Sequence, residues 1–346
     1  MPPHKTTTLL IEDSGFMRII LSDLLKSDPS IELLGTASNG LKGLEKIRQL
    51  RPDVIITDMV MPESDGLAVV KNVMQNNPKP VILLSSLEKE DPKVFEALLA
   101  GAFDFLNKEE VTKLAKQQQF PLNEMVKVAA GVSLGKLAGA RGEKNTFEHS
   151  FDEQLRYEAI AIGASTGGPV AIEQLLNGLP ANLNIPVIIA QHMPEQFLRS
   201  FAKRLDRVIP LRVKLAQQGE EPEGGTVYVL PGHKNSHVIL DSHTNRPIFS
   251  FTRKKYREFN FPSIDGLFMS LAEVYGKKLI GIVLTGMGRD GTKGLQAIQQ
   301  QRGFTIAQDE KSSVVFGMPK SAIDHKVINQ VLALKEIPGF VVSCLA

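Results

Sequence analysis

The chain has 346 residues, of which 42% are hydrophobic and 23% are charged. This length suits two domains, each with enough apolar side chains to bury a core. Lysine and arginine number 40 against 38 aspartate and glutamate, so the net charge of +2 does not indicate a nucleic acid or membrane partner. One cysteine, Cys344, excludes a disulfide framework within the chain.

The chain shows no pattern for membrane insertion or export. No apolar run reaches the roughly 18 residues of a membrane span. The N-terminus lacks an apolar stretch followed by a small-residue cleavage site. We therefore expect a cytoplasmic protein without direct membrane insertion.

The first third of the chain alternates short apolar runs with amphipathic stretches. Apolar residues at helical spacing predict helices at 16–28 and 40–50. Short apolar runs predict strands at 7–11, 31–38, 53–57, 80–85 and 103–106. Strands that alternate with helices indicate a doubly wound α/β domain, with helices on both faces of a parallel sheet.

The alternation of strands and helices weakens after residue 108 and resumes at residue 157. Residues 122–139 predict one more helix, so the first domain is expected over 1–138. The polar stretch 139–154 predicts a linker, and a second doubly wound, Rossmann-like domain is expected over 155–346. Its predicted strands are 158–163, 185–190, 226–230, 237–240, 279–284 and 303–307.

Acidic residues follow two strands of the first domain. Glu12 and Asp13 come directly after the first strand, and Asp58 comes directly after the third. Because the carboxyl ends of parallel strands share one edge, three carboxylates should converge there. Such a cluster suits Mg²⁺, which neutralises charge as a phosphoryl group moves to a carboxylate. For Glu12 and Asp13 by themselves, capping of the next helix is the alternative.

A hydroxyl and an ammonium group follow two more strands of this domain. Ser85 ends the fourth strand and can donate a hydrogen bond to a phosphoryl group. Lys108 follows the fifth strand and can pair with the same group as a point charge. Four strand ends each supply a group that phosphoryl transfer needs, which favours a phosphoryl-accepting site over a chance arrangement.

The segments LLIEDSGFMR, DVIITDMVMPESDGL, VILLSS and GAFDFLNK resemble the response-regulator receiver family across residues 6–108. The resemblance implies that Asp58 is phosphorylated, with a histidine kinase of the chemotaxis type as phosphodonor. It also implies that Glu12, Asp13 and Asp58 bind Mg²⁺ together with the carbonyl oxygen of Val60.

The same resemblance implies roles for three further residues. Ser85 takes the switch hydroxyl role, with Ser86 as the alternative because one sequence does not fix the register. Phe105 takes the aromatic switch position, and Lys108 pairs with the phosphate. The family usually has proline after this lysine, whereas this chain has Glu109, which puts the local loop geometry in question but not the chemistry.

A glycine-rich turn opens the second domain. Residues 163–167, GASTG, join a predicted strand to a predicted helix and match the pattern G-x-S-x-G. Ser165 would lie near a helix N-terminus, where backbone N–H groups favour developing negative charge. A phosphate-binding turn and a plain strand–helix connection are the alternatives.

Two further strand ends offer partners for this serine. His192 follows the apolar run 185–190, at the same sheet edge as Ser165, and is the candidate base. Asp290, in TGMGRDG after the strand 279–284, is the candidate carboxylate that orients the base. The backbone N–H of Met287 can serve an oxyanion hole. A tight turn in which Asp290 caps the next helix is the alternative.

The order Ser165, His192, Asp290 differs from that of α/β-hydrolases, chymotrypsin and subtilisin. The segments AIGASTGGP, QHMPEQFLRSFAKRLD, VYVLPG, FNFPSIDGLFMSLAEVYG, IVLTGMGRDG and GMPKSAI resemble the catalytic domain of chemotaxis protein-glutamate methylesterases over residues 157–346. This resemblance implies the same Ser/His/Asp roles, with Met287 at the oxyanion hole and no cofactor in this domain.

The two domains together resemble the full-length methylesterase family. The resemblance implies phosphorylation-regulated hydrolysis of glutamate methyl esters on methyl-accepting chemoreceptors, and deamidation of receptor glutamines. A phosphorylation-dependent transcription factor is the competing class. Its output domain would be shorter, helical and more basic, and RKKYR at 253–257 is the only dense basic run. A regulator with an inactive hydrolase domain is disfavoured because all three triad candidates are present.

Overall fold

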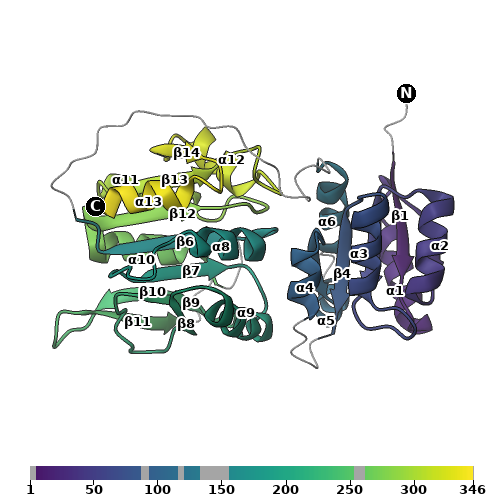
Figure 1. Ribbon diagram of the computed structural model, residues 1–346, viewed down its shortest axis with the longest axis horizontal. Coiled ribbons are helices and arrows are strands. Elements are labelled where there is room, and N and C mark those ends of the chain that lie inside the picture. Colours follow the sequence, from purple (N-terminus) through teal and green to yellow (C-terminus); the bar gives the residue numbers. More distant parts are fainter. Residues whose placement is uncertain (1–4, 87–92, 116–120, 133–155, 253–261, 346) are drawn as a thin grey trace. The chain divides into compact units, whose positions relative to one another are not determined.

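The computed structural model describes residues 5–86, 93–115, 121–132, 156–252 and 262–345 (Figure 1). The chain divides into two compact units, residues 1–140 and 141–346. The predicted linker at 139–154 and the basic run at 253–257 lie outside the described residues.

The first unit contains a five-stranded parallel sheet flanked by helices (Figure 1). The strand order is β2–β1–β3–β4–β5. The strands are β1 (Thr6–Ile11), β2 (Ile31–Ala37), β3 (Val54–Asp58), β4 (Val81–Ser85) and β5 (Asp104–Asn107). The helices are α1 (Gly15–Lys26), α2 (Gly40–Leu50), α3 (Gly66–Asn76), α4 (Lys93–Leu99), α5 (Lys108–Ala115) and α6 (Pro121–Ala130).

Side-chain caps fix where three helices of this unit begin. The side chains of Ser14, Asn39 and Asp65 each accept a hydrogen bond from the backbone N–H three residues later, at the starts of α1, α2 and α3. Such caps satisfy N–H groups that a helix leaves unpaired at its start. The N-cap of α1 is therefore Ser14 rather than Glu12 or Asp13, although Glu12 Oε1 accepts a hydrogen bond from the N–H of Ser14 at 3.2 Å.

The second unit contains a seven-stranded parallel sheet with the order β14–β13–β12–β6–β7–β9–β8. Its strands are β6 (Ala159–Ala164), β7 (Val187–Gln191), β8 (Arg212–Leu215), β9 (Thr226–Val229), β12 (Leu279–Val283), β13 (Phe304–Gln308) and β14 (Gln330–Leu332). An antiparallel hairpin joins β10 (Asn235–Leu240) to β11 (Pro247–Thr252). The helices are α8 (Gly168–Asn177), α9 (Glu195–Val208), α10 (Ile264–Tyr275), α11 (Thr292–Gln300), α12 (Met318–Asp324) and α13 (Ile337–Leu345), and the short 3-10 helix η1 (Gly276–Lys278) follows α10.

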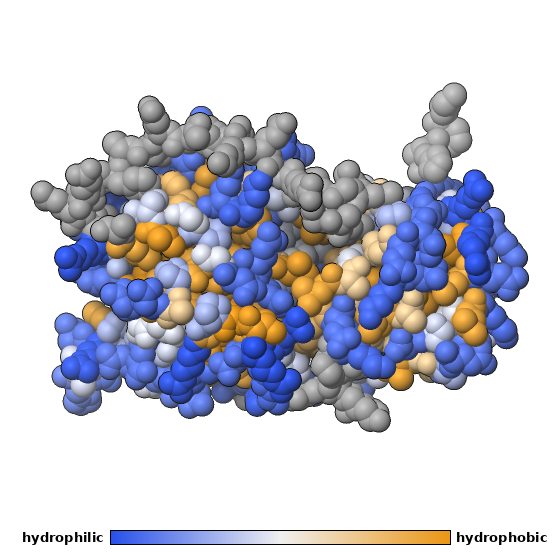
Figure 2. Space-filling view, in the orientation of Figure 1, coloured by the Kyte–Doolittle hydropathy of each residue, from blue (hydrophilic) through white to orange (hydrophobic). Residues whose placement is uncertain are grey.

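Helix α10 packs deep in the core of this unit. Its residues Ile264 and Phe268 are fully buried, and both belong to the same apolar cluster as the sheet residues. Two glycines allow the close approach. A Cβ atom on Gly163 of β6 would lie 2.4 Å from Ile264 Cγ2, and one on Gly294 of α11 would lie 2.4 Å from Phe268 Cβ. The N-terminus of α10 is thereby held against the sheet. On the outside, hydrophilic residues occupy much of the viewed surface of each unit (Figure 2).

The predicted α/β class and the two parallel sheets are confirmed. Three details differ. The predicted strand 237–240 belongs to the antiparallel hairpin and not to the parallel sheet. The helix predicted over 122–139 ends at Ala130, because Gly131 forms a turn, and residues 133–139 of the predicted range lie outside the described residues. The strands β8, β11 and β14 were not predicted from the sequence. No helix in the described ranges combines the length and the apolar character needed to cross a membrane.

Replacing Gly163 by alanine should destabilise the second unit by about 1–3 kcal/mol, because the new methyl group meets the fully buried side chains of Ile264 and Phe268. All four tyrosines lie beyond residue 140, and the chain has no tryptophan, so tyrosine fluorescence during urea unfolding reports on the second unit alone. Gly339→Ala is the matched control, because a Cβ there meets nothing within 4 Å. Equal unfolding midpoints for the two variants would contradict the packing argument.

Candidate functional site

A tight turn after β6 presents Ser165. The backbone N–H of Ser165 donates to the carbonyl of Thr285 at 3.1 Å, and the N–H of Gly168 donates to the carbonyl of Ser165 at 2.7 Å. Gly167 has a φ of 75°, a conformation that favours glycine. A Cβ at this position would also lie 2.8 Å from the Cβ of Val314. The glycines thus let the chain turn into α8 with the serine at the carboxyl end of its strand.

His192 and Asp290 meet at the same edge of the sheet. His192 follows β7, and its backbone N–H donates to the carbonyl of Ala164 at 3.0 Å, which places it beside the Ser165 turn. Its Nε2 atom lies 2.7 Å from Oδ2 of Asp290, a residue 98 positions away in the sequence. The two side chains are 13% and 3% exposed, so water screens their interaction little.

The Asp290 carboxylate also binds the N-terminus of α10. Oδ2 accepts a hydrogen bond from the N–H of Ile264 at 2.9 Å, and Oδ1 accepts from the N–H groups of Asp265 at 2.9 Å and Gly291 at 3.0 Å. With His192, these donors occupy the acceptor capacity of the carboxylate. Asp290 therefore does not cap the helix that follows it, as the alternative supposed: its carboxylate binds the first N–H groups of α10, and the N-cap residue of α11, Gly291, makes no side-chain cap.

The protonation of this pair follows from its surroundings. Burial alone would raise the pKa of Asp290, but the hydrogen bond and charge of His192 and the α10 N–H groups hold that pKa below its usual value. An anionic Asp290 accepts from Nε2, so the proton of a neutral His192 belongs on Nε2. The Nδ1 atom is then the one available as a base.

The surroundings of the Ser165 hydroxyl suit an incoming substrate. Within the described ranges, this hydroxyl has no hydrogen-bond partner, and the backbone N–H groups of Thr166 and Met287 have no acceptor. Gly286 lies against the serine, since a Cβ on it would be 2.7 Å from Ser165 Cβ. The lack of a side chain at Gly286 brings the Met287 segment close to the serine.

Sequence reasoning did not find the buried amide of Gln191. Its Nε2 atom donates to the carbonyl of Ser165 at 3.0 Å and to that of His192 at 3.1 Å. It therefore fixes the two turns relative to each other. The role of the α10 N-terminus was also missed, although Ser263 before an apolar run is a helix-start signal.

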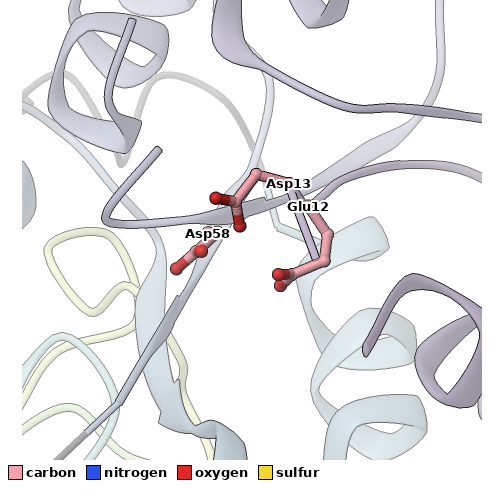
Figure 3. A group of neighbouring side chains, drawn as sticks. All are labelled: Glu12, Asp13 and Asp58. Carbon is pink, nitrogen blue, oxygen red and sulfur yellow. The ribbon is translucent and has the colours of Figure 1, made fainter. Parts of the chain in front are cut away.

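In the first unit, the side chains of Glu12, Asp13 and Asp58 gather at the carboxyl ends of β1 and β3 (Figure 3). One carboxylate oxygen of each residue lies within 4.8 Å of the others. Glu12 and Asp58 are buried and Asp13 is exposed, which leaves the cluster open to solvent on one side. An all-oxygen set of this kind fits the preference of Mg²⁺ for carboxylates and water.

Lys108 is the cation of this cluster. Its Nζ atom lies 2.8 Å from Glu12 Oε2 and 2.7 Å from Asp58 Oδ2. Burial raises the pKa of both carboxyl groups and outweighs their bonds to Lys108. Burial would lower the pKa of Lys108, but the two carboxylates raise it above its usual value. One lysine thus offsets only part of the charge of the three carboxylates, and a divalent cation would neutralise the excess negative charge.

The remaining predicted residues of the first unit surround this cluster. The N–H of Val60 donates to Asp58 Oδ1 at 3.3 Å. Ser85 is buried at the end of β4 and Ser86 after it is exposed. Phe105 is buried in β5, and Glu109 lies in the first turn of α5, which starts directly at Lys108.

Comparisons with known proteins agree with this architecture. The CheB methylesterase family matches residues 160–341, and the response regulator receiver domain family matches residues 8–117. The chain is 37% identical to the protein-glutamate methylesterase/protein-glutamine glutaminase of Pyrococcus abyssi, and the match covers 99% of this chain and 94% of that protein. The chain belongs to the protein-glutamate methylesterase/protein-glutamine glutaminase family.

Another member of this family, from Desulfitobacterium hafniense, is 35% identical, with 99% of this chain and 98% of that protein covered. The crystal structure of the Thermotoga maritima CheB methylesterase catalytic domain is similar with a TM-score of 0.52 and 36% identity. The match covers 55% of this chain and 99% of the Thermotoga maritima chain.

Replacing Asp58 by asparagine should stabilise the first unit in the absence of Mg²⁺. An acid whose pKa is raised by folding destabilises the folded state above that pKa, and the penalty disappears as the pH falls through it. The gain should therefore be largest at neutral pH and shrink on acidification. Added Mg²⁺ should raise the melting temperature of the unchanged chain more than that of Asp58→Asn.

Calorimetry of the full chain measures this effect, with the transition of the second unit identified by tyrosine fluorescence. Asp53→Asn is a useful control, because Asp53 accepts from Thr7 at the opposite end of the same strands. A Mg²⁺ response that survives unchanged in Asp58→Asn would exclude Asp58 from the metal site.

Proposed function

We propose that this chain hydrolyses methyl esters of glutamate side chains on methyl-accepting chemoreceptors, with Ser165, His192 and Asp290 as its catalytic triad. The observation that carries the proposal is the buried contact between His192 Nε2 and Asp290 Oδ2 at 2.7 Å, at the sheet edge where the Ser165 turn also lies. Membership in a family whose relatives are named protein-glutamate methylesterases supplies the substrate class.

In the proposed reaction, Ser165 Oγ attacks the ester carbonyl carbon and gives its proton to His192 Nδ1. Asp290 stabilises the imidazolium that forms. The N–H groups of Met287 and Thr166 donate to the oxygen that becomes negative. The bond between the carbonyl carbon and the methoxy oxygen then breaks, His192 gives the proton to that oxygen and methanol leaves. Water hydrolyses the acyl-serine by the same steps.

The same acyl transfer serves a glutamine amide, with ammonia as the leaving group in place of methanol. We therefore propose deamidation of receptor glutamines as a second activity of the site, in keeping with the glutaminase name of the relatives. Neither reaction calls for a metal or cofactor in this unit.

We infer that the first unit is a receiver domain over residues 1–138, joined through a linker at 139–154 to the catalytic domain over 155–346. Asp58 would accept a phosphoryl group from a histidine kinase of the chemotaxis type. Glu12, Asp13, Asp58 and the Val60 carbonyl would hold Mg²⁺, which supplies charge neutralisation during the transfer.

The phosphoryl group formed on Asp58 would find two partners. Lys108 already lies against this carboxylate and can pair with the added charge. Ser85, or Ser86 in the alternative register, would donate a hydroxyl hydrogen bond, and Phe105 would change its packing with that switch. Phosphorylation would thereby change the surface of the receiver and release the catalytic domain from restraint.

Replacing Ser165 by alanine should lower kcat for a glutamate methyl ester by about 10⁴-fold or more, because only binding and oxyanion stabilisation remain. Methanol release measures the rate. A serine-reactive phosphonate should label the native chain once and should not label Ser165→Ala. Ser343→Ala, at an exposed site on α13, is the control and should behave as the unchanged chain. Activity above about a tenth of the original would exclude Ser165 as the nucleophile, since that loss is only ~1.4 kcal/mol.

Residues 155–346 alone should hydrolyse the ester faster than the unphosphorylated full chain. Acetyl phosphate with Mg²⁺ should add one phosphoryl group to the full chain and raise its rate, with no effect on the isolated catalytic domain. Asp58→Asn is the control, which should neither gain mass nor respond. If the isolated domain were no faster than the unphosphorylated chain, inhibition by the receiver would be the wrong account of the regulation.

A further inference from the structure

The second unit contains a buried acidic side chain that the proposed mechanism does not use. Asp265 lies in the first turn of α10 and is 8% exposed. Its backbone N–H donates to Asp290 Oδ1 at 2.9 Å. Its own carboxylate Oδ1 accepts from the N–H of Gly294 on α11 at 2.8 Å. Asp265 therefore contacts both Asp290 and α11, the helix that follows Asp290 in the chain.

These contacts connect the two helices that surround Asp290. Asp290 lies in the turn directly before α11, whose N-cap residue Gly291 has no side chain to satisfy the first N–H groups of the helix. The carboxylate of Asp265 supplies an acceptor from the neighbouring helix instead. The helices are in direct contact there, since a Cβ on Gly294 would lie 3.2 Å from Asp265 Cα.

We propose that Asp265 is a positioning residue for the reaction, whose carboxylate ties α11 to α10 and so holds the Asp290 carboxylate against His192. This inference rests on the proposed function of the second unit. Three of the donors to Asp290 are backbone N–H groups of α10 and of the turn before α11. Their positions therefore depend on how these two helix starts are held together.

The electrostatic setting of Asp265 supports the same role. Burial raises the pKa of Asp265 to about 6, the N–H of Gly294 opposes this, and the charge of Asp290 adds to the rise. Lys293 of α11 lowers the pKa. Above this pH, Asp265 is ionised, and a carboxylate is a stronger acceptor for the N–H of Gly294 than the neutral acid. The bond between the two helices is therefore strongest when Asp265 is charged.

The kinetic test compares Asp265→Ala with Asp265→Asn in the full chain, assayed with acetyl phosphate and Mg²⁺. The alanine variant should lose between about 10- and 100-fold in kcat, the range expected when a reacting group is slightly misplaced. Its KM should change little. The asparagine variant keeps an oxygen acceptor for Gly294 and should recover most of this loss.

Ser270→Ala is the matched control on the same helix. Its hydroxyl accepts a buried hydrogen bond from the N–H of Val238 at 3.0 Å and does not contact Asp290. It should lower stability while kcat and KM stay as in the unchanged chain. Tyrosine fluorescence confirms that each variant is folded. A full kcat in Asp265→Ala, or an equal fall of kcat in Ser270→Ala, would overturn the proposal.

A second measurement is independent of enzymatic activity. The NMR signal of the His192 Nε2–H proton, assigned with the variant His192→Gln, reports on the hydrogen bond between His192 and Asp290. Its chemical shift should move in Asp265→Ala and return toward the original value in Asp265→Asn. An unchanged shift in Asp265→Ala would overturn the proposal. If the unchanged chain hydrolysed no ester at all, the proposed function would fail, while this signal would still decide the role of Asp265.

Discussion

The buried carboxylate of Asp290 is the group on which the geometry of the second unit's site depends. An ionised carboxylate away from water is costly unless hydrogen bonds and an opposite charge compensate it. Here the compensation comes from α10, from the turn before α11 and from the imidazole after β7. These elements must all meet at one point, so satisfying a single charge also fixes the orientation of His192.

The two units use buried carboxylates in opposite ways. Asp290 is surrounded by donors that lower its pKa, and its hydrogen-bonding capacity is filled, so it is suited to hold a neighbour in place. Asp58 and Glu12 have raised pKa values and share one lysine. Their negative charge is only partly compensated, which suits a group that binds a cation and changes its own charge during a reaction.

The sequence located the edge of each site because parallel strands impose a simple rule. Side chains that follow such strands share one edge, and Ser165, His192 and Asp290 each follow a strand of the central set β6, β7 and β12. The same rule predicted that the acidic residues at the ends of β1 and β3 lie close together in the first unit. The hydrophobic periodicity of the sequence was enough to locate the strands, and the rule needs no more than that.

Contacts that depend on packing between distant elements were not predictable in this way. The hydrogen bonds from α10 to Asp290 and the double donation by Gln191 require the tertiary structure. Periodicity also did not distinguish β10, a hairpin strand, from a strand of the parallel sheet, because both are short apolar runs. The strands β8 and β14 were missed because β8 carries charged residues and β14 has only three residues.

The separation of His192 and Asp290 by 98 positions has a consequence for folding. The site exists only after β6 has paired both with β7, the next strand in the chain, and with β12, which is contributed by a remote part of the chain. Such long-range parallel pairings form slowly and late, since a large loop must close before any contact is gained. A chain that has folded only as far as β7 would therefore hold the turns of Ser165 and His192 at the sheet edge without the carboxylate that orients the imidazole.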